Sequence, residues 1–444
     1  MYKPQLIMST DNLVFAPVSL PCGYTLRPFQ KGDEQSWIDI CSEAFNSDFE
    51  WKNEFREGAL FFACDESGTP VACAGIRLAR DGEPDPTRAY LHFVACKKAH
   101  SGKGLGKAVV VAALTAAREL YGFKGAVLTT DDERIFAIKL YLSLGFTPVY
   151  NSLSYFDRWN AIYSALGIDK NAWYEAEAAT KKAFEADGYA IYPDDYVIDP
   201  KSDCIPKLLA YPATGTKTSI IVCRGGGYGG KAYHEGALVC EFFRKNGISA
   251  FLLDYRVAPC THPTQLNDVQ RAIRWLRKNA DTFGISPDRI GVIGFSAGGH
   301  LASMAATLFD GGKPDSADEV ERFSSRPDYA VLSYAVISLI SYTHEGTAHN
   351  LLGSQYSIGS RKALSGELNV TAQTPPCFIW HTANDDGVPV ENSLQFAAAL
   401  SANEIPFELH IFPKGPHGIG LGDGYEGAEQ WKWLCLKWLD TLFK

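Results

Sequence analysis

The chain has 444 residues, of which 46% are hydrophobic and 21% charged, and this ordinary globular composition excludes wholesale disorder. Its 42 basic and 51 acidic residues give a formal net charge of −9, which argues against a general binder of nucleic acid or of an anionic membrane. At roughly 100–200 residues per domain, this length predicts two or three domains.

The sequence shows no sign of export, membrane insertion or structural zinc. Its N-terminus lacks a basic segment followed by an apolar core, and no run approaches about 18 apolar residues. The 11 cysteines are an odd number without a CxxC pair, which is typical of free thiols rather than of disulfides or a zinc site. We therefore expect a cytoplasmic protein that holds no metal ion.

Strands alternate with helices in the first part of the chain. The expected elements are a helix at 106–122 and strands at 61–65, 70–79, 89–96 and 126–130. Gly102, Gly104 and Gly106 lie where strand 89–96 gives way to the helix. Glycines at such a place let the backbone approach an anion, toward which the first N–H groups of the helix point. The loop predicts a pyrophosphate cradle, with a plain strand-to-helix turn as the alternative.

This segment resembles the loop of the GNAT superfamily of N-acetyltransferases, which reads Q/R-x-x-G-x-G/A after a strand carrying V-x-P. Residues 137–146 are similar to the family's A-x-x-L-Y-x-x-x-G-F, and the resemblance covers residues 24–150. It implies acetyl-CoA as the cofactor, a pyrophosphate held by the backbone around 102–107, pantetheine along 93–96, and Tyr141 as the acid that protonates the leaving thiolate. The cofactor-binding residues that it implies are Phe93, Ala95, Cys96, Gly102, Lys103, Gly104, Leu105, Gly106, Lys107 and Tyr141.

Two positions depart from the pattern of the family. Ser101 stands where the family has Arg or Gln, which removes a cation from the phosphate site, and residues 96–98 (Cys-Lys-Lys) replace V-x-P. His92 is the one candidate base, with a half-buried strand side chain as its alternative. Tyr141 has the alternative of a core aromatic. The domain is expected to be either an acetyltransferase or a degenerate binding or scaffolding module.

A helical stretch at 171–188, rich in Ala, Glu and Lys, separates the two parts of the chain. We expect a GNAT-like domain at 1–165, a helical linker at 166–187 and a second domain at 188–444. The second part again alternates strands and helices, which predicts an α/β fold with a mostly parallel, helix-covered sheet. Its expected elements are strands at 219–223, 249–255, 289–295, 375–382 and 407–412, a helix before residue 249, and helices at 268–284 and 297–309.

Residues 294–298 (Gly-Phe-Ser-Ala-Gly) form a G-x-S-x-G motif between an expected strand and an expected helix. A sharp turn between strand and helix lifts a serine hydroxyl above the sheet, so Ser296 is the predicted nucleophile. Such a serine needs a base. His417 follows the last expected strand and is the predicted base, whereas His410 and His381 lie within or at the end of strands.

The base in turn needs an orienting carboxylate. Asp385 and Asp386 both lie on the loop after strand 375–382, so the order Ser, Asp, His leaves both open. An oxyanion hole is expected from an earlier glycine turn and from the residue after the serine. The predicted donors are the N–H groups of Gly226, Gly227 and Ala297.

Residues 190–444 resemble the hormone-sensitive-lipase-like branch of the α/β-hydrolases. The segment 254–303 carries most of the resemblance, Arg224–Gly227 stand for the family's H-G-G-G, and HTANDDGVPVENS and HNLLG are similar to its small acetyl esterases, including carbohydrate esterases. The D-x-x-V-P pattern of these relatives favours Asp385 over Asp386. The resemblance implies hydrolysis, without a cofactor, of a small acyl ester such as an acetylated saccharide.

Three other functions compete with this interpretation. Gly225–Gly230 with Asp254 imitate a dinucleotide fingerprint, and with Lys231 nearly a P-loop, although Ala232 lacks the hydroxyl that would bind Mg²⁺. A serine peptidase or amidase would use the same triad, but no propeller or large cap precedes the fold. A bifunctional enzyme would add acetyl groups with one domain and remove them with the other.

Overall fold

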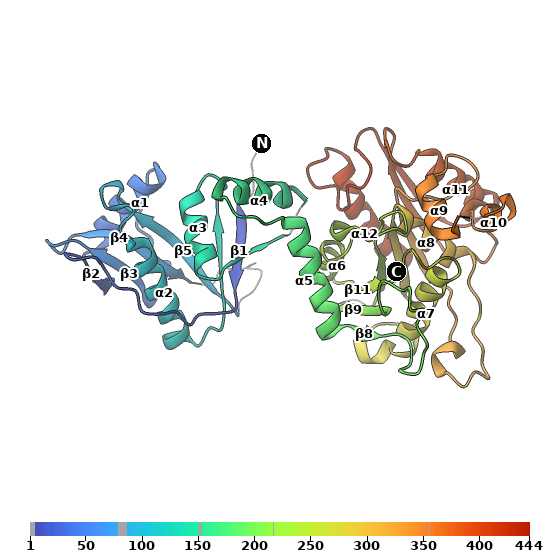
Figure 1. The fold of residues 1–444 in the computed structure, drawn as a ribbon, viewed down its shortest axis with the longest axis horizontal. Helices are drawn as coiled ribbons and strands as arrows, with labels where there is room; N and C mark the ends of the chain where they lie inside the picture. Colours follow the sequence, from blue (N-terminus) through green and yellow to red (C-terminus); the bar gives the residue numbers. More distant parts are fainter. Residues whose placement is uncertain (1–4, 79–86, 151–152, 216, 355) are drawn as a thin grey trace. The chain divides into compact units, whose positions relative to one another are not determined.

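The computed structural model describes residues 5–78, 87–150, 153–215, 217–354 and 356–444. It separates into two units, the first comprising Met1–Tyr150 and Arg158–Asp169 and the second Asn151–Asp157 and Lys170–Lys444 (Figure 1). Among the helices of these described residues, none combines the length and the apolar character that crossing a membrane requires.

The first unit contains a mixed sheet. Its described strands are β1 (Leu6–Thr10), β2 (Thr25–Pro28), β3 (Phe55–Cys64), β4 (Pro70–Arg77), β5 (Ala89–Cys96), β6 (Ala126–Thr130) and β7 (Thr147–Val149). Their order is β2-β3-β4-β5-β6-β1-β7, and every neighbouring pair is antiparallel except β5 with β6. The helices here are α1 (Glu34–Phe45), α2 (Leu105–Tyr121), α3 (Ile135–Ser143) and, from Arg158 onward, α4 (Leu153–Leu166).

The strands β5 and β6 separate soon after they meet. They pair only at Ala89 with Ala126 and at Tyr90 with Val127. Further along β5, Phe93 has a φ of +50°, which is uncommon for a residue with a side chain. The glycine loop and α2 follow β5 directly, and α2 packs against β3, β4 and β5. In the described pairing, the second half of β5 is therefore not hydrogen-bonded to β6.

The second unit is built on a larger sheet. Its described strands are β8 (Tyr189–Ala190), β9 (Lys207–Tyr211), β10 (Ser219–Cys223), β11 (Ser249–Asp254), β12 (Ile290–Phe295), β13 (Tyr329–Ser333), β14 (Cys377–Thr382) and β15 (Phe407–Phe412). Their order is β15-β14-β13-β12-β10-β11-β9-β8. The pairs from β11 to β15 are parallel, and β8 and β9 add an antiparallel edge.

Helices cover this sheet on both faces. They are α5 (Ala172–Asp187), α6 (Ala237–Lys245), α7 (Thr264–Lys278), α8 (Ala297–Thr307), α9 (Glu345–Leu352), α10 (Ile358–Ala363), α11 (Glu391–Ala402) and α12 (Trp431–Leu442). One core joins α7, α8 and α11 to strand residues such as Ile221 and Ile379. On the other face Trp438 of α12 packs against Tyr329 and Phe378. Burial on both faces explains why the central strands are apolar throughout.

The α/β class agrees with the structure, and the strands predicted from long apolar runs agree within two residues at each described end, except that β3 begins six residues before the strand predicted at 61–65. The strands β1, β2, β7, β8, β9 and β13 have no counterpart among the predicted elements. They are two to five residues long, so their pairing depends on neighbouring strands rather than on a local pattern. The end of the strand predicted at 70–79 lies outside the described residues, and α5, within the predicted linker, belongs to the second unit.

Candidate functional site

Ser296 lies on a strained turn between β12 and α8. Its backbone has φ +53° and ψ −120°, a conformation that residues with side chains rarely adopt. A Cβ on Gly294 would lie 1.9 Å from the carbonyl oxygen of Gly298, and a Cβ on Gly298 would lie 2.2 Å from that of Cys223. The two glycines of the motif are therefore required for the turn to close, and the turn holds the Ser296 side chain above the sheet.

His417 connects Ser296 to Asp385. Its Nε2 lies 2.7 Å from the Ser296 Oγ, and its Nδ1 lies 2.8 Å and 3.1 Å from the two carboxylate oxygens of Asp385. The loops after β14 and β15 supply the acid and the histidine, so three segments separated in sequence meet at one edge of the sheet. The arrangement has the order and the contacts of a nucleophile, a base and an orienting carboxylate.

Asp385 is buried and strongly hydrogen-bonded, whereas its neighbour Asp386 lies at the surface. The Oδ1 atom of Asp385 accepts the N–H groups of Gly387 and Val388, at 2.9 Å and 2.8 Å. Burial raises the pKa of this carboxyl, but hydrogen bonds from His381 and His417 and from the backbone outweigh it and hold the pKa well below its usual value. Asp386 instead accepts the backbone N–H of His417 at 3.1 Å.

The two other histidines considered from the sequence have different surroundings. His381 is fully buried, and its Nε2 donates to the carbonyl of Val388 at 2.9 Å while lying 3.2 Å from Asp385. Because that carbonyl can only accept, His381 is a donor that helps to orient Asp385. His410 lies 3.1 Å from Glu408 at the edge strand β15. Neither ring contacts the Ser296 hydroxyl in the described hydrogen bonds.

The glycine loop after β10 passes close to Ser296. A Cβ on Gly225 would lie 3.0 Å from the Ser296 Cβ, and Gly226 and Gly227 have φ values of +123° and +61°. Among the described residues, none accepts a hydrogen bond from the N–H of Gly226, Gly227 or Ala297. These three N–H groups could therefore donate hydrogen bonds to an oxyanion.

A buried glutamate that the sequence analysis missed ties this loop to the histidine loop. Glu235 is 2% exposed; it accepts the N–H of Gly225 at 2.7 Å and the hydroxyl of Tyr334 at 2.7 Å. The Tyr334 hydroxyl accepts the N–H of Gly420 at 2.8 Å, and its ring packs edge-on against His417. The short segment around Glu235 has no motif or periodicity that could have revealed this role.

His300, two residues after the G-x-S-x-G motif, is hydrogen-bonded to Tyr228 of the glycine loop. Its Nδ1 accepts the hydroxyl of Tyr228 at 2.9 Å, and its Nε2 donates to the carbonyl of Leu364 at 2.7 Å. The Leu364 carbonyl can only accept, so Nε2 carries a proton, and in the neutral ring Nδ1 is then the acceptor of the Tyr228 hydroxyl. Burial lowers the pKa of His300 to about 4, against the smaller opposing effect of the bond to Leu364.

We expect the second unit to lose stability in mild acid because of His300. Its folded-state pKa lies below its unfolded value of 6.5, so the unfolded chain binds the extra proton as the pH falls from 6.5 to about 4. Across this window the free energy of unfolding should fall by about 3 kcal/mol. Urea midpoints followed by tryptophan fluorescence at pH 7 and pH 4 measure this fall. A His300→Gln variant, which cannot titrate, should show a smaller fall; an equal fall would contradict the assignment.

Arg224 is a buried cation at the position where the H-G-G-G pattern has its histidine. It is 2% exposed and contacts Glu177 of α5 at 3.3 Å and Asp254 at 3.1 Å. The neighbouring Lys231 contacts Asp203 at 2.7 Å and Asp254 at 2.8 Å. The two residues that imitate a nucleotide fingerprint, Asp254 and Lys231, are thus engaged with each other, which disfavours nucleotide binding here.

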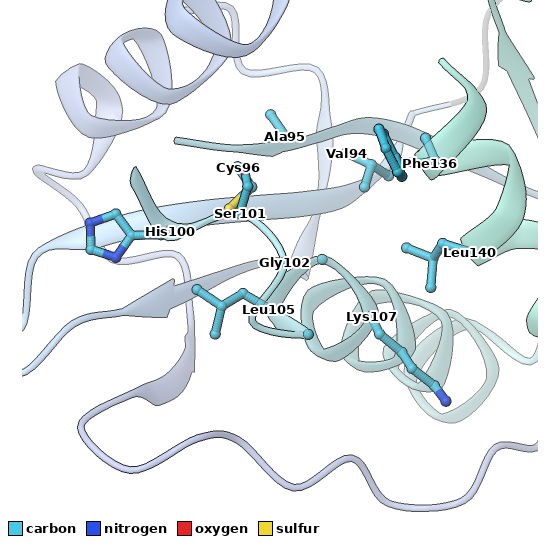
Figure 2. A pocket seen from close by; sticks show the side chains of 13 residues that line it. Val94, Ala95, Cys96, His100, Ser101, Gly102, Leu105, Lys107, Phe136 and Leu140 are labelled. Atoms are coloured by element: carbon cyan, nitrogen blue, oxygen red, sulfur yellow. The ribbon is translucent and has the colours of Figure 1, made fainter. Parts of the chain in front are cut away.

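A cavity of about 640 Å³ lies along the second half of β5 in the first unit. Figure 2 shows side chains of β5, of the glycine loop with α2, and of α3 around it. It is lined by the predicted cofactor residues Ala95, Cys96, Gly102, Gly104, Leu105, Gly106 and Lys107. Gly102 and Gly104 have φ values of +76° and +80°, so the loop is a glycine-dependent turn before the N-terminus of α2. These residues fit a pyrophosphate-carrying cofactor.

The remaining residues of the predicted cofactor site lie elsewhere. Phe93 and Tyr141 line a second cavity of about 240 Å³, together with His92. The two cavities share Val94 and Ala137 as lining residues, so they adjoin. Tyr141 is buried, which raises the pKa of its hydroxyl and keeps the proton on it. Lys103 does not line the first cavity; its ammonium donates to the Tyr24 hydroxyl at 2.8 Å.

Comparisons with known proteins agree with this division. The family model "Acetyltransferase (GNAT) family" matches residues 26–146, and the model "BD-FAE" matches residues 209–400. Endo-1,4-beta-xylanase B of Butyrivibrio fibrisolvens is 37% identical over 53% of this chain and 39% of its own length. An acetylxylan esterase of Xylanibacter ruminicola is 30% identical over 52% of this chain and 47% of its own length. The chain thus spans less than half of each of these curated relatives.

A solved structure covers the second unit more completely. The acetyl ester-xyloside bifunctional hydrolase of Caldicellulosiruptor lactoaceticus is 45% identical, with a TM-score of 0.56, over 57% of this chain and 96% of that one. The similarity therefore extends over nearly the whole of that solved chain.

Proposed function

We propose that this chain, whose residues 26–146 belong to the GNAT acetyltransferase family and whose C-terminal part belongs to the α/β-hydrolases, is a serine esterase that releases acetate from small, sugar-containing esters. The observation that carries the proposal is the continuous contact from the Ser296 Oγ through His417 to the buried Asp385 carboxylate. An esterase needs these groups in this order, and a nucleotide-binding domain or a binding module needs none of them.

The proposed mechanism assigns one step to each group. His417 Nε2 takes the proton of Ser296 as its Oγ attacks the ester carbonyl, and the same nitrogen then protonates the leaving alcohol. Asp385 keeps the Nδ1 proton in place and stabilises the imidazolium. The N–H groups of Gly226, Gly227 and Ala297 donate to the oxyanion, each worth about 2.7–4 kcal/mol in the transition state. Water, activated by His417, then hydrolyses the acyl-enzyme.

The substrate class follows from the relatives. The names of two of them state acetyl ester or acetylxylan hydrolysis. We extend this to the present chain as an acetyl group on a saccharide or a similar small alcohol. A serine peptidase or amidase would have the same triad and is the alternative within this unit.

A chain-length series tests the proposed esterase. We expect the kcat/KM of the wild-type chain to be highest for p-nitrophenyl acetate, lower for the butyrate and lowest for the octanoate. In a second assay, we expect the chain to release acetate from acetylated xylosides. Highest activity on the octanoate would contradict a short-chain esterase. Cleavage of peptide p-nitroanilides with no ester hydrolysis would favour the peptidase.

A second function, acetyl transfer, is supported by the two adjoining cavities of the first unit. Acetyl-CoA would supply the acetyl group as a thioester, held by the backbone of the loop 102–107. Since the cavities meet at Val94 and Ala137, a thioester at that point faces the space that His92 and Tyr141 line. The Tyr141 hydroxyl retains its proton for a leaving thiolate.

We expect acetyl-CoA to bind with a micromolar Kd in calorimetry, and Gly106→Asp to weaken binding more than tenfold, because the new carboxylate lies at the α2 N-terminus and repels the pyrophosphate. The matched control is Gly122→Asp at the opposite end of the helix. Absence of binding by the wild-type chain would favour the degenerate module. Thiol release in the presence of amine or hydroxyl acceptors would establish a bifunctional enzyme.

A further inference from the structure

His344 lies at the N-terminus of α9 with its ring orientation determined by the helix. Its Nδ1 accepts the backbone N–H of Thr347 at 3.2 Å and lies 2.9 Å from the Thr347 hydroxyl. Because a backbone N–H can only donate, Nδ1 must carry a lone pair. The neutral ring therefore carries its proton on Nε2, and no described residue accepts a hydrogen bond from that atom.

The ring lies beside the candidate catalytic site. A Cβ on Gly227 would be 3.7 Å from the His344 Cε1, and Asn350 of the same helix donates to the Gly227 carbonyl at 2.9 Å. Burial lowers the pKa of His344, and a positive charge on His417 lowers it further, so the ring is neutral when the enzyme works. The imidazole thus presents a free donor at the edge of the glycine loop.

We propose that His344 is a substrate-binding residue that selects the alcohol part of the ester, by donating its Nε2–H to a hydroxyl or ring oxygen of a sugar. The inference rests on the proposed esterase function and adds to it a residue outside the triad and the oxyanion donors. The acyl carbonyl already has Gly226, Gly227 and Ala297 as donors. A further donor next to Gly227 is therefore available to the alcohol part of the ester, and a polyhydroxylated alcohol offers it several hydroxyl and ring oxygens as acceptors.

The variant His344→Asn separates this role from that of the helix cap. Asparagine is among the best N-cap residues, so it can still accept the N–H of Thr347, but its short side chain lacks the Nε2 donor. We expect kcat/KM for an acetylated xyloside to fall about tenfold more than that for p-nitrophenyl acetate, in line with the loss of one hydrogen bond. His344→Gln, which restores an N–H at a similar reach, should recover part of this selectivity.

His349 provides the matched control, since it is an exposed histidine of the same helix. His349→Asn should leave both rates unchanged. Equal losses on the two substrates with His344→Asn, or no loss on either, would overturn the role of His344 while the esterase proposal stands. A wild-type chain that hydrolyses p-nitrophenyl acetate but no acetylated xyloside would overturn the sugar specificity and this inference. Inactivity on every ester would overturn the proposed function itself.

Discussion

Replacing Ser296 with alanine is expected to lower kcat for p-nitrophenyl acetate by about 10⁶-fold, as the loss of a triad nucleophile does in other serine hydrolases. In the proposed mechanism the Ser296 Oγ attacks the ester, and it is the atom that contacts His417 Nε2. Alanine fits the space of serine, although it shares the strain of the positive φ. The rate constant is measured with wild-type and variant chains at equal concentration.

A covalent probe provides an independent measurement of the same prediction. An alkyl fluorophosphonate should transfer its phosphonyl group once to the wild-type chain, with loss of HF, and not at all to Ser296→Ala, because the O–P bond forms on the activated hydroxyl as the P–F bond breaks. The urea midpoint serves as the folding control. Activity that survives the substitution, or labelling at another residue, would contradict Ser296 as the nucleophile and direct attention to the acetyltransferase unit.

Asp385→Asn is expected to lower kcat by about 10⁴-fold, the second-largest effect. Two backbone N–H groups donate to Oδ1 of Asp385, and His417 Nδ1 is closest to Oδ2. In the asparagine variant the amide oxygen should keep the two backbone donors, which places the NH₂ group at His417 Nδ1. Nδ1 must then accept, the ring proton moves to Nε2, and the base can no longer take the proton of Ser296.

Asp386→Asn is the matched control, because it makes the same chemical change one residue away. Asp386 accepts only the backbone N–H of His417 among the described contacts, and an amide oxygen can do the same. We expect its kcat to stay within about tenfold of wild type, the effect of one exposed hydrogen bond. Steady-state kinetics of the two variants decide between the two acids; a larger loss in Asp386→Asn would assign the role to Asp386.

The sequence alone was sufficient for the α/β class, for the two-part organisation and for the candidate residues Ser296 and His417. These follow from local patterns: apolar runs that become buried strands, and a G-x-S-x-G turn whose glycines are required by close backbone approaches. The turn at Gly102 and Gly104 was predictable in the same way, because both residues have a positive φ and glycine is the residue type that adopts it most readily.

The order of the triad left Asp385 and Asp386 open and the D-x-x-V-P resemblance favoured Asp385, but only the tertiary structure shows which carboxylate lies buried against His417. It also revealed Glu235, His300 and His344, whose partners lie on segments distant in sequence. In the first unit the separation of β5 from β6, whose residues together line the second cavity, arises from strand pairing and not from a local pattern. Short-range propensity determines which helices and strands form. The contacts between distant segments determine which side chains lie together, and the candidate sites of this chain are built from such contacts.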